Sequence, residues 1–114
     1  MAIHPLARKI EAWVVQHYEA VPSPPSTILP LFFHFPGTCE TDQATGSRFN
    51  MGQIYGAVKL TVALLKSGTS LMGEDIVPIT PCRSNRARLQ KALEEATDEH
   101  PGGRGVAVNT VEGF

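Results

Sequence analysis

The sequence predicts an α/β fold with three layers, in which helices flank a mostly parallel sheet. Apolar residues recur with a helical period in some segments and form short continuous runs in others. Segments rich in proline and glycine separate the two kinds, and each periodic segment is long enough to cross from one parallel strand to the next. The resulting order, α-β-α-β-α-β, favours a parallel sheet with helices on its faces.

The first predicted helix runs from His4 to Glu19. Its apolar stripe consists of Leu6, Ile10, Trp13, Val14, His17 and Tyr18. Pro5 is tolerated in the first turn, where its missing N–H has no helical partner. The proline-rich run Val21–Ser26 ends the helix, because proline biases the preceding residue towards extended backbone.

A continuous apolar run, Ile28–Phe35, follows and stops at Pro36 and Gly37. Its length and aromatic content are typical of a strand buried on both faces. The polar segment Thr38–Arg48 contains a glycine, and we expect a loop there.

The second predicted helix spans Asn50–Lys66, with Asn50 as its N-cap and Gly68 as its stop signal. Gly52 and Gly56 lie inside it, where each glycine costs about 1 kcal/mol relative to alanine. Close packing against another backbone would explain why glycines occur there.

The last three elements are a strand, a helix and a strand. We expect the first strand at Asp75–Ile79 and a helix that has Thr80 as N-cap and Pro81 at its first position. The apolar stripe of this helix consists of Leu89, Ala92, Leu93 and Ala96. Pro101–Gly103 ends it, Arg104–Thr110 forms the final strand, and 111–114 is left over.

Length and composition favour one folded domain over residues 1–114. Hydrophobic residues make up 42% and charged residues 18%, which is enough to build a core and argues against disorder. The net charge of -1 provides no overall attraction for nucleic acid, so binding would need a local patch.

Cysteine and histidine patterns exclude several classes of site. Cys39 and Cys82 form neither a disulfide framework nor a zinc motif, and the four histidines have no metal-ligand spacing. We therefore expect no metal. No apolar run approaches the ~18 residues that a membrane span needs, and no secretory signal is recognised. We expect an intracellular chain, cytoplasmic or nuclear, with no membrane partner.

No catalytic motif is recognised within the 114 residues. The phosphate-binding pattern GxxxxGK(S/T) is absent, as are a nucleophile elbow and a Cys/His pair. We therefore assign no catalytic residues.

The predicted third helix carries its charges in an unusual order. Arg83, Arg86 and Arg88 lie at its start, and acidic residues lie at its end, which opposes the helix dipole. Such a conflict can mark an anion site. The alternative is a solvated helix with pairs such as Arg86–Gln90 and Lys91–Glu95. The pattern taken alone favours that alternative.

Five segments together resemble the superfamily 1 helicases of the nonsense-mediated-decay and senataxin type. They are Ile3–Pro5, Leu31–Phe35, Ser47–Ile54, Asp75–Arg83 and Val106–Phe114. Asp75–Arg83 is similar to motif IV, D-I-x-V-I-T-P-Y-R, and Val106–Phe114 is similar to the opening of motif V, V-x-V-N-T-V-D-G-F-Q-G. These two motifs are the most specific, and the order and spacing agree over nearly the whole chain.

The resemblance implies that residues 1–114 are part of the second RecA-like domain, a P-loop NTPase fold, of an ATP-dependent helicase, a hydrolase. It implies a nucleotide contact at Arg83. It also implies nucleic-acid contacts at Thr80, Asn109, Thr110 and Gly113. Expected partners are RNA or single-stranded DNA, bound weakly, together with the first RecA-like domain.

Departures from the family pattern argue against activity of this chain alone. The family uses ATP and magnesium, but these residues include no phosphate-binding loop, Walker B acid or arginine finger, so we expect no cofactor and no ATP hydrolysis. Cys82 stands where the family has an aromatic residue, Pro78 falls inside a predicted strand, and Gln53-Ile54 replaces Glu-Ala.

Two alternatives remain open. The chain could be a stand-alone α/β interaction module that binds a protein partner at an exposed sheet edge. It could also be a non-functional truncated gene product without a stable fold.

Overall fold

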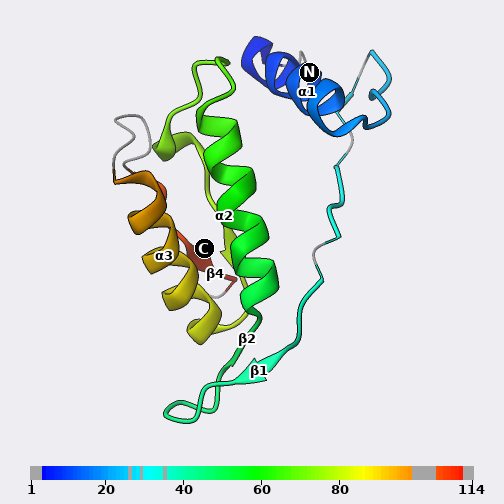
Figure 1. The fold of residues 1–114 in the computed structure, drawn as a ribbon. Coiled ribbons are helices and arrows are strands. Elements are labelled where there is room, and N and C mark those ends of the chain that lie inside the picture. Colours follow the sequence, from blue (N-terminus) through cyan, green and yellow to red (C-terminus); the bar gives the residue numbers. More distant parts are fainter. Residues whose placement is uncertain (1–3, 26, 29, 35, 99–104, 112–114) are drawn as a thin grey trace.

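The computed structural model describes the chain except residues 1–3, 26, 29, 35, 99–104 and 112–114. Its elements, in chain order (Figure 1), are α1 (Pro5–Tyr18), β1 (Glu40–Thr41), β2 (Arg48–Phe49), α2 (Met51–Leu65), the 3-10 helix η1 (Gly73–Asp75), β3 (Ile79–Thr80), α3 (Arg83–Thr97) and β4 (Asn109–Thr110).

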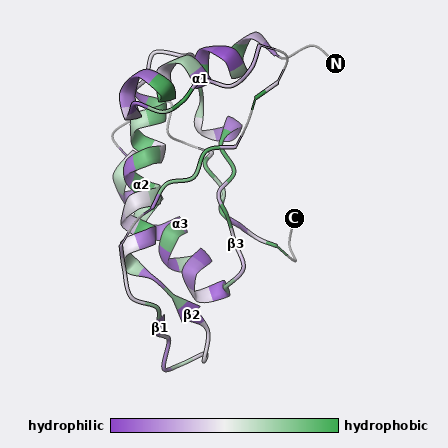
Figure 2. Cartoon of the chain, turned by 90° about the vertical axis from the view of Figure 1, so that its right-hand side faces the viewer, coloured by the Kyte–Doolittle hydropathy of each residue, from purple (hydrophilic) through white to green (hydrophobic). Residues whose placement is uncertain are grey.

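The core lies between α2, α3 and the chain that leads into β4. Its buried side chains are Ile54, Leu89, Leu93, Val106 and Val108, with Met51, Ala57, Val58 and Ala92 packed around them. Ile54 comes from α2 and Leu93 from α3, and each is only 1% exposed. In Figures 1 and 2 the two helices lie on the same side of the β3–β4 pair.

The two strands that carry the motif IV and motif V resemblances pair in parallel. Ile79 lies opposite Asn109 and Thr80 opposite Thr110. Side chains alternate along both strands. Val108 and Thr80 are buried against the helices, whereas Ile79 and Val111 are exposed on the other face. The predicted fold also has helices on the opposite face of the sheet, and this third layer stays a prediction.

The first two predicted helices are confirmed, as is the N-cap predicted for the second, whereas the cap of the first was not predicted. The Leu6 N–H donates to Nδ1 of His4 at 3.1 Å at the start of α1. At the start of α2 the Gln53 N–H donates to Oδ1 of Asn50, also at 3.1 Å, as the sequence predicted. Both caps satisfy N–H groups that have no partner inside the helix.

The expected close packing is present at Gly52. A Cβ atom there would collide with the carbonyl oxygen of Pro36 and would lie 2.8 Å from Cα of Gly37. The start of α2 and the segment before β1 therefore touch backbone to backbone, which only glycine allows.

The third helix begins later than the sequence predicted. Its N-cap is Cys82, which makes no side-chain cap, and its first residue is Arg83. The prediction of Thr80 as N-cap and Pro81 as first residue is therefore wrong, because Thr80 is taken up by β3 and pairs with Thr110. Tertiary pairing overrides the local capping signal here.

The strand predicted at Asp75–Ile79 is also displaced. Its first residue belongs to η1, and the strand is confined to Ile79–Thr80. Pro78 precedes it, and its carbonyl accepts a hydrogen bond from the Asn109 N–H at 3.0 Å. Proline lacks an N–H but keeps its carbonyl group, so Pro78 can still accept this bond.

The buried strand predicted at Ile28–Phe35 is wrong for the described residues. They form no strand, Leu31 is exposed, and the Phe32 side chain is 93% exposed. The segment runs as an extended trace between α1 and β1 (Figure 1). Consistent with this, the radius of gyration is 15.2 Å, above the roughly 13 Å of a compact chain of this length.

The prediction of a loop at Thr38–Arg48 is only partly right, because this segment forms most of the β1–β2 hairpin, which ends at Phe49. Glu40 pairs with Phe49 and Thr41 with Arg48, antiparallel. Asp42 shapes the turn, because its Oδ1 accepts the N–H groups of Ala44 and Thr45. The strands are too short for a periodicity to reveal them.

Among the described residues, no helix combines the length and apolar character that crossing a bilayer requires.

Candidate functional site

The carboxyl ends of β3 and β4 lie side by side, and α3 starts shortly after β3. This places Thr80 and Thr110 opposite each other, with Asn109 opposite Ile79. Arg83 is the first residue of α3. Ligands of open α/β sheets bind at this end of the strands. The structure therefore gathers four predicted site residues in one region, whereas Gly113 lies outside the described residues.

Thr80 is occupied in a polar network rather than open to a ligand. It is 6% exposed, and its Oγ1 accepts a hydrogen bond from Nδ2 of Asn85 at 3.0 Å. Oδ1 of Asn85 in turn accepts the N–H of Asn50 at 3.0 Å. Asn85 thus connects α3 to β3 and to the cap of α2. Sequence reasoning missed Asn85, because a single asparagine in a helix carries no signal of its distant partners.

The other predicted contact residues are more accessible. Asn109 and Thr110 are half-buried, and Arg83 is exposed. Arg83 makes no hydrogen bond or ion pair with its side chain in the part of the chain that the structure describes. Its guanidinium is therefore available to an anion.

Two of the three arginines at the start of α3 hold other elements in place. Nε of Arg86 donates to the carbonyl of Val108 at 2.9 Å. The Arg88 guanidinium lies 3.7 Å from the centre of the Phe49 ring and 3.6 Å from the Asp42 carboxylate. The unusual order of charges in α3 is explained for both residues by tertiary partners.

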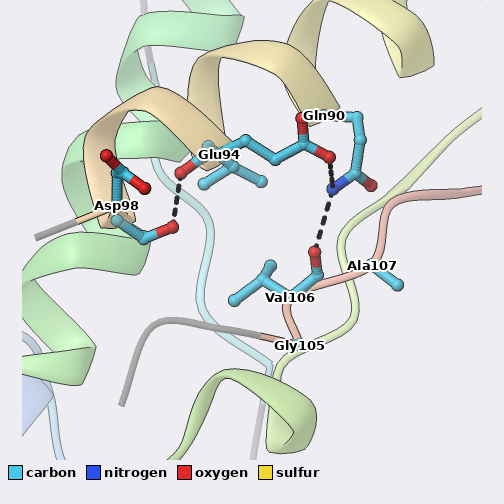
Figure 3. Close-up of a pocket in the computed structure, with 8 residues that line it drawn as sticks. Gln90, Glu94, Asp98, Gly105, Val106 and Ala107 are labelled. Atoms are coloured by element: carbon cyan, nitrogen blue, oxygen red, sulfur yellow. Dashed lines mark hydrogen bonds between the residues drawn. The ribbon is translucent and has the colours of Figure 1, made fainter. Parts of the chain in front are cut away.

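The helix pairs considered from the sequence are not found among the described residues. Instead, Nε2 of Gln90 donates to Oε1 of Glu94 at 3.3 Å and to the carbonyl of Val106 at 3.1 Å (Figure 3). Oε1 of Gln90 accepts the N–H of Val108 at 2.8 Å. The side chains of Arg86 and Gln90 therefore bond to backbone N–H and C=O groups along one edge of residues 106–108. A neighbouring strand would otherwise pair with these groups.

The small pocket beside Thr80 has a volume of about 100 Å³ and is also lined by Arg48, Asn85 and both cysteines, Cys39 and Cys82. Small-molecule sites usually enclose about 300–1,000 Å³. This pocket is therefore too small for a nucleotide.

The carboxyl group of Asp42 contacts the start of α3. The Ala44 N–H lowers the pKa of its carboxyl most, followed by the Ser84 hydroxyl. Burial raises the pKa, and the Thr45 N–H and the charge of Arg88 lower it by smaller amounts. Ser84 donates to Oδ2 at 3.1 Å. The carboxylate thus joins the hairpin to α3 in its ionised form.

In the described residues, no three histidine, cysteine, aspartate or glutamate side chains lie close enough to hold a metal ion.

The comparisons with known proteins yield no relative: no family model, no curated protein and no solved structure matches the chain. The resemblance to helicases rests on the sequence motifs.

Proposed function

We propose that the chain binds single-stranded nucleic acid, as part of the second motor domain of an ATP-dependent helicase. Contact occurs with the sugar–phosphate backbone at the carboxyl ends of β3 and β4. Binding by the chain alone is weak, because the net charge of -1 adds no overall attraction.

One observation carries the proposal: the parallel register of β3 and β4. The two segments that resemble helicase motifs, Asp75–Arg83 and Val106–Phe114, are far apart in the sequence. Their strands nevertheless pair, and Thr80 lies opposite Thr110. Two motifs that contact one ligand must lie close together in the fold, and the pairing of β3 with β4 brings these two together. The register is independent of the motif comparison and therefore supports the resemblance.

The contact residues have different roles. Asn109 and Thr110 supply hydrogen-bonding side chains at the strand end. Arg83 supplies a positive charge, and the resemblance to helicases implies that it lies on the side of the bound nucleotide. Thr80 acts indirectly, because its hydroxyl fixes Asn85 and thereby the start of α3.

Binding is tested by fluorescence anisotropy with labelled single-stranded RNA and DNA at low salt. We expect saturable binding that weakens as salt rises. Arg83→Gln should weaken binding about fivefold, as for one exposed ion pair, and reduce the salt slope by about 0.7. Thr110→Val, which keeps the shape and removes the hydroxyl, should weaken it less.

The matched control is Lys59→Gln, which removes an exposed charge from α2. It should leave affinity unchanged. Equal losses for Lys59→Gln and Arg83→Gln, or no binding at low salt, would overturn the proposal.

Hydrolysis of ATP by this chain alone is not expected, because the 114 residues contain no phosphate-binding loop. A phosphate-release assay with single-stranded RNA checks this expectation, and turnover above the protein-free blank would contradict it.

A second candidate is a protein-interaction module. Val77, Ile79 and Val111 are exposed large hydrophobic residues in or beside β3 and β4. One edge at 106–108 is already occupied by Gln90 and Arg86, so a partner would use the β3 side. Size-exclusion chromatography with and without oligonucleotide separates the two candidates. Self-association without oligonucleotide favours the second.

A further inference from the structure

A second, larger cleft lies between α3 and the turn of the β1–β2 hairpin. In Figure 1 the hairpin lies near the start of α3. Its volume is about 570 Å³, within the range of small-molecule sites. Arg83, Ala87 and Lys91 line it from one face of the helix, since residues four apart lie above one another. Thr45 and Ser47 line it from the hairpin.

The charges in this cleft leave a positive excess. Lys91, like Arg83, makes no hydrogen bond or ion pair with the described residues. The one acidic side chain that lines the cleft, Asp42, already accepts hydrogen bonds at both oxygens and lies next to Arg88. An incoming anion would therefore meet two cations that are unpaired among the described residues, and a carboxylate that is already paired with Arg88.

The hairpin contributes hydroxyl groups whose protons are free. Oγ1 of Thr45 accepts the Ser47 N–H at 3.2 Å, and Oγ of Ser47 accepts the Ser84 N–H at 3.0 Å. Neither O–H has an acceptor among the described residues. A hydroxyl that already accepts a bond can still donate one. The two walls thus present donors and positive charges, which is the complement of a phosphate group.

We propose that this cleft binds a phosphate group. Ala87 keeps the floor open between Arg83 and Lys91, where a larger side chain would fill the space. The group can belong to a phosphomonoester or to the phosphodiester backbone of a nucleic acid. Arg83 is shared with the contacts proposed for the region of β3 and β4, whereas Thr45, Ser47, Ala87 and Lys91 take no part in them.

The test is a titration of the ¹⁵N-labelled chain with inorganic phosphate and, separately, with a single-stranded oligonucleotide. The amide shifts of Thr45, Ser47 and Ala87 are followed by NMR. We expect saturable shifts at these residues. Lys91→Gln should weaken binding about fivefold, as for one exposed ion pair. Ala87→Leu, which blocks the floor without changing charge, should weaken it at least as much.

The control is Lys59→Gln, which removes an exposed charge from α2, away from the cleft. It should bind like the unmodified chain. All three substitutions are at exposed helix positions, and an unchanged spectrum of the remaining residues verifies the fold.

The two arms identify the source of the phosphate. Saturation by inorganic phosphate indicates a phosphomonoester site, and shifts with the oligonucleotide alone indicate a backbone phosphodiester. Absence of shifts in both arms overturns the site. So does an equal loss for Lys59→Gln and Lys91→Gln, or unaltered binding by Ala87→Leu. Weaker oligonucleotide binding by Thr110→Val with unchanged phosphate binding separates this site from the one at β3 and β4.

Discussion

The Pro5–Thr38 region and the Asn50–Thr110 region differ in how far they bury their apolar side chains. The Pro5–Thr38 region is at least as rich in apolar residues. Yet Val14 is its only buried hydrophobic residue among those described, whereas the Asn50–Thr110 region buries Ile54, Leu93 and Val108 almost completely. Apolar content alone therefore does not produce a core.

The difference comes from the partners that each apolar segment has. In the Asn50–Thr110 region, the apolar stripes of α2 and α3 face each other and the chain leading into β4. In the Pro5–Thr38 region, α1 contacts mainly the chain that follows it. Arg8 donates to the carbonyls of Pro24 and Pro25, and the Tyr18 ring packs edge-on against Phe33 at 4.9 Å. Proline N–H groups are missing there, so regular pairing is hindered.

Core truncation should separate the two regions most strongly. Leu93→Ala removes a side chain that is 1% exposed and should lower the free energy of unfolding by about 2–5 kcal/mol. Phe32→Ala, at a 93% exposed side chain, should change it by less than about 0.5 kcal/mol. Urea unfolding of both variants measures this. A comparable loss for Phe32→Ala would show that the N-terminal region buries this side chain in solution.

The contact between the two regions is tested by Gly52→Ala. In an exposed helix this change stabilises by about 1 kcal/mol. Here the new Cβ would collide with the Pro36 carbonyl, so we expect a destabilisation of about 1–3 kcal/mol, as for overpacking. Gln53→Ala, at the next and exposed position, is the matched control in the same urea experiment. A stabilised Gly52→Ala variant would mean that the two regions do not touch in solution.

The edge contact inside the Asn50–Thr110 region is tested by Gln90→Leu. The substitution leaves the Val108 N–H and the Val106 carbonyl without their side-chain partner. The expected loss is about 1–3 kcal/mol, the usual cost of unsatisfied buried groups. Hydrogen exchange at the Val108 amide should accelerate. Lys91→Ala, on the same helix, should leave that exchange rate unchanged, and unchanged exchange in Gln90→Leu would refute the contact.

The smallest expected effect concerns the hairpin between the two regions and depends on pH. The pKa of Asp42 is lowered below its ordinary value of 3.8 in the folded chain. Its contribution to stability is therefore fully present above 3.8 and is lost as the pH falls through the folded-state pKa. NMR shifts of Ala44 and Thr45 should report loosening of the turn in that acidic range. In Asp42→Asn this pH dependence should vanish, and its persistence would assign it to another carboxyl.

Several features of the fold could be predicted from the sequence, because they depend on bonds within a segment. The period of apolar residues gave the three helices, and Asn50 marked the start of α2 through a hydrogen bond only three residues long. Gly52 indicated a close backbone approach, although not that its partner would be Pro36. Residues of the candidate site could be named from the sequence only through the motif resemblance, as at Thr80 and Thr110, and their contacts stay predictions.

The sequence by itself determined the helices, the capping of α2 and the order of the segments that pair in parallel. Only the tertiary structure decided that the described residues of the segment 28–35 lie outside the core cluster. It also decided that Arg86 and Arg88 bind other elements, and that a hairpin turn faces Lys91 across a cleft. The physical reason is that helix periodicity and caps arise from neighbours along the chain. Burial and charge pairing instead depend on which distant surfaces are present to receive them.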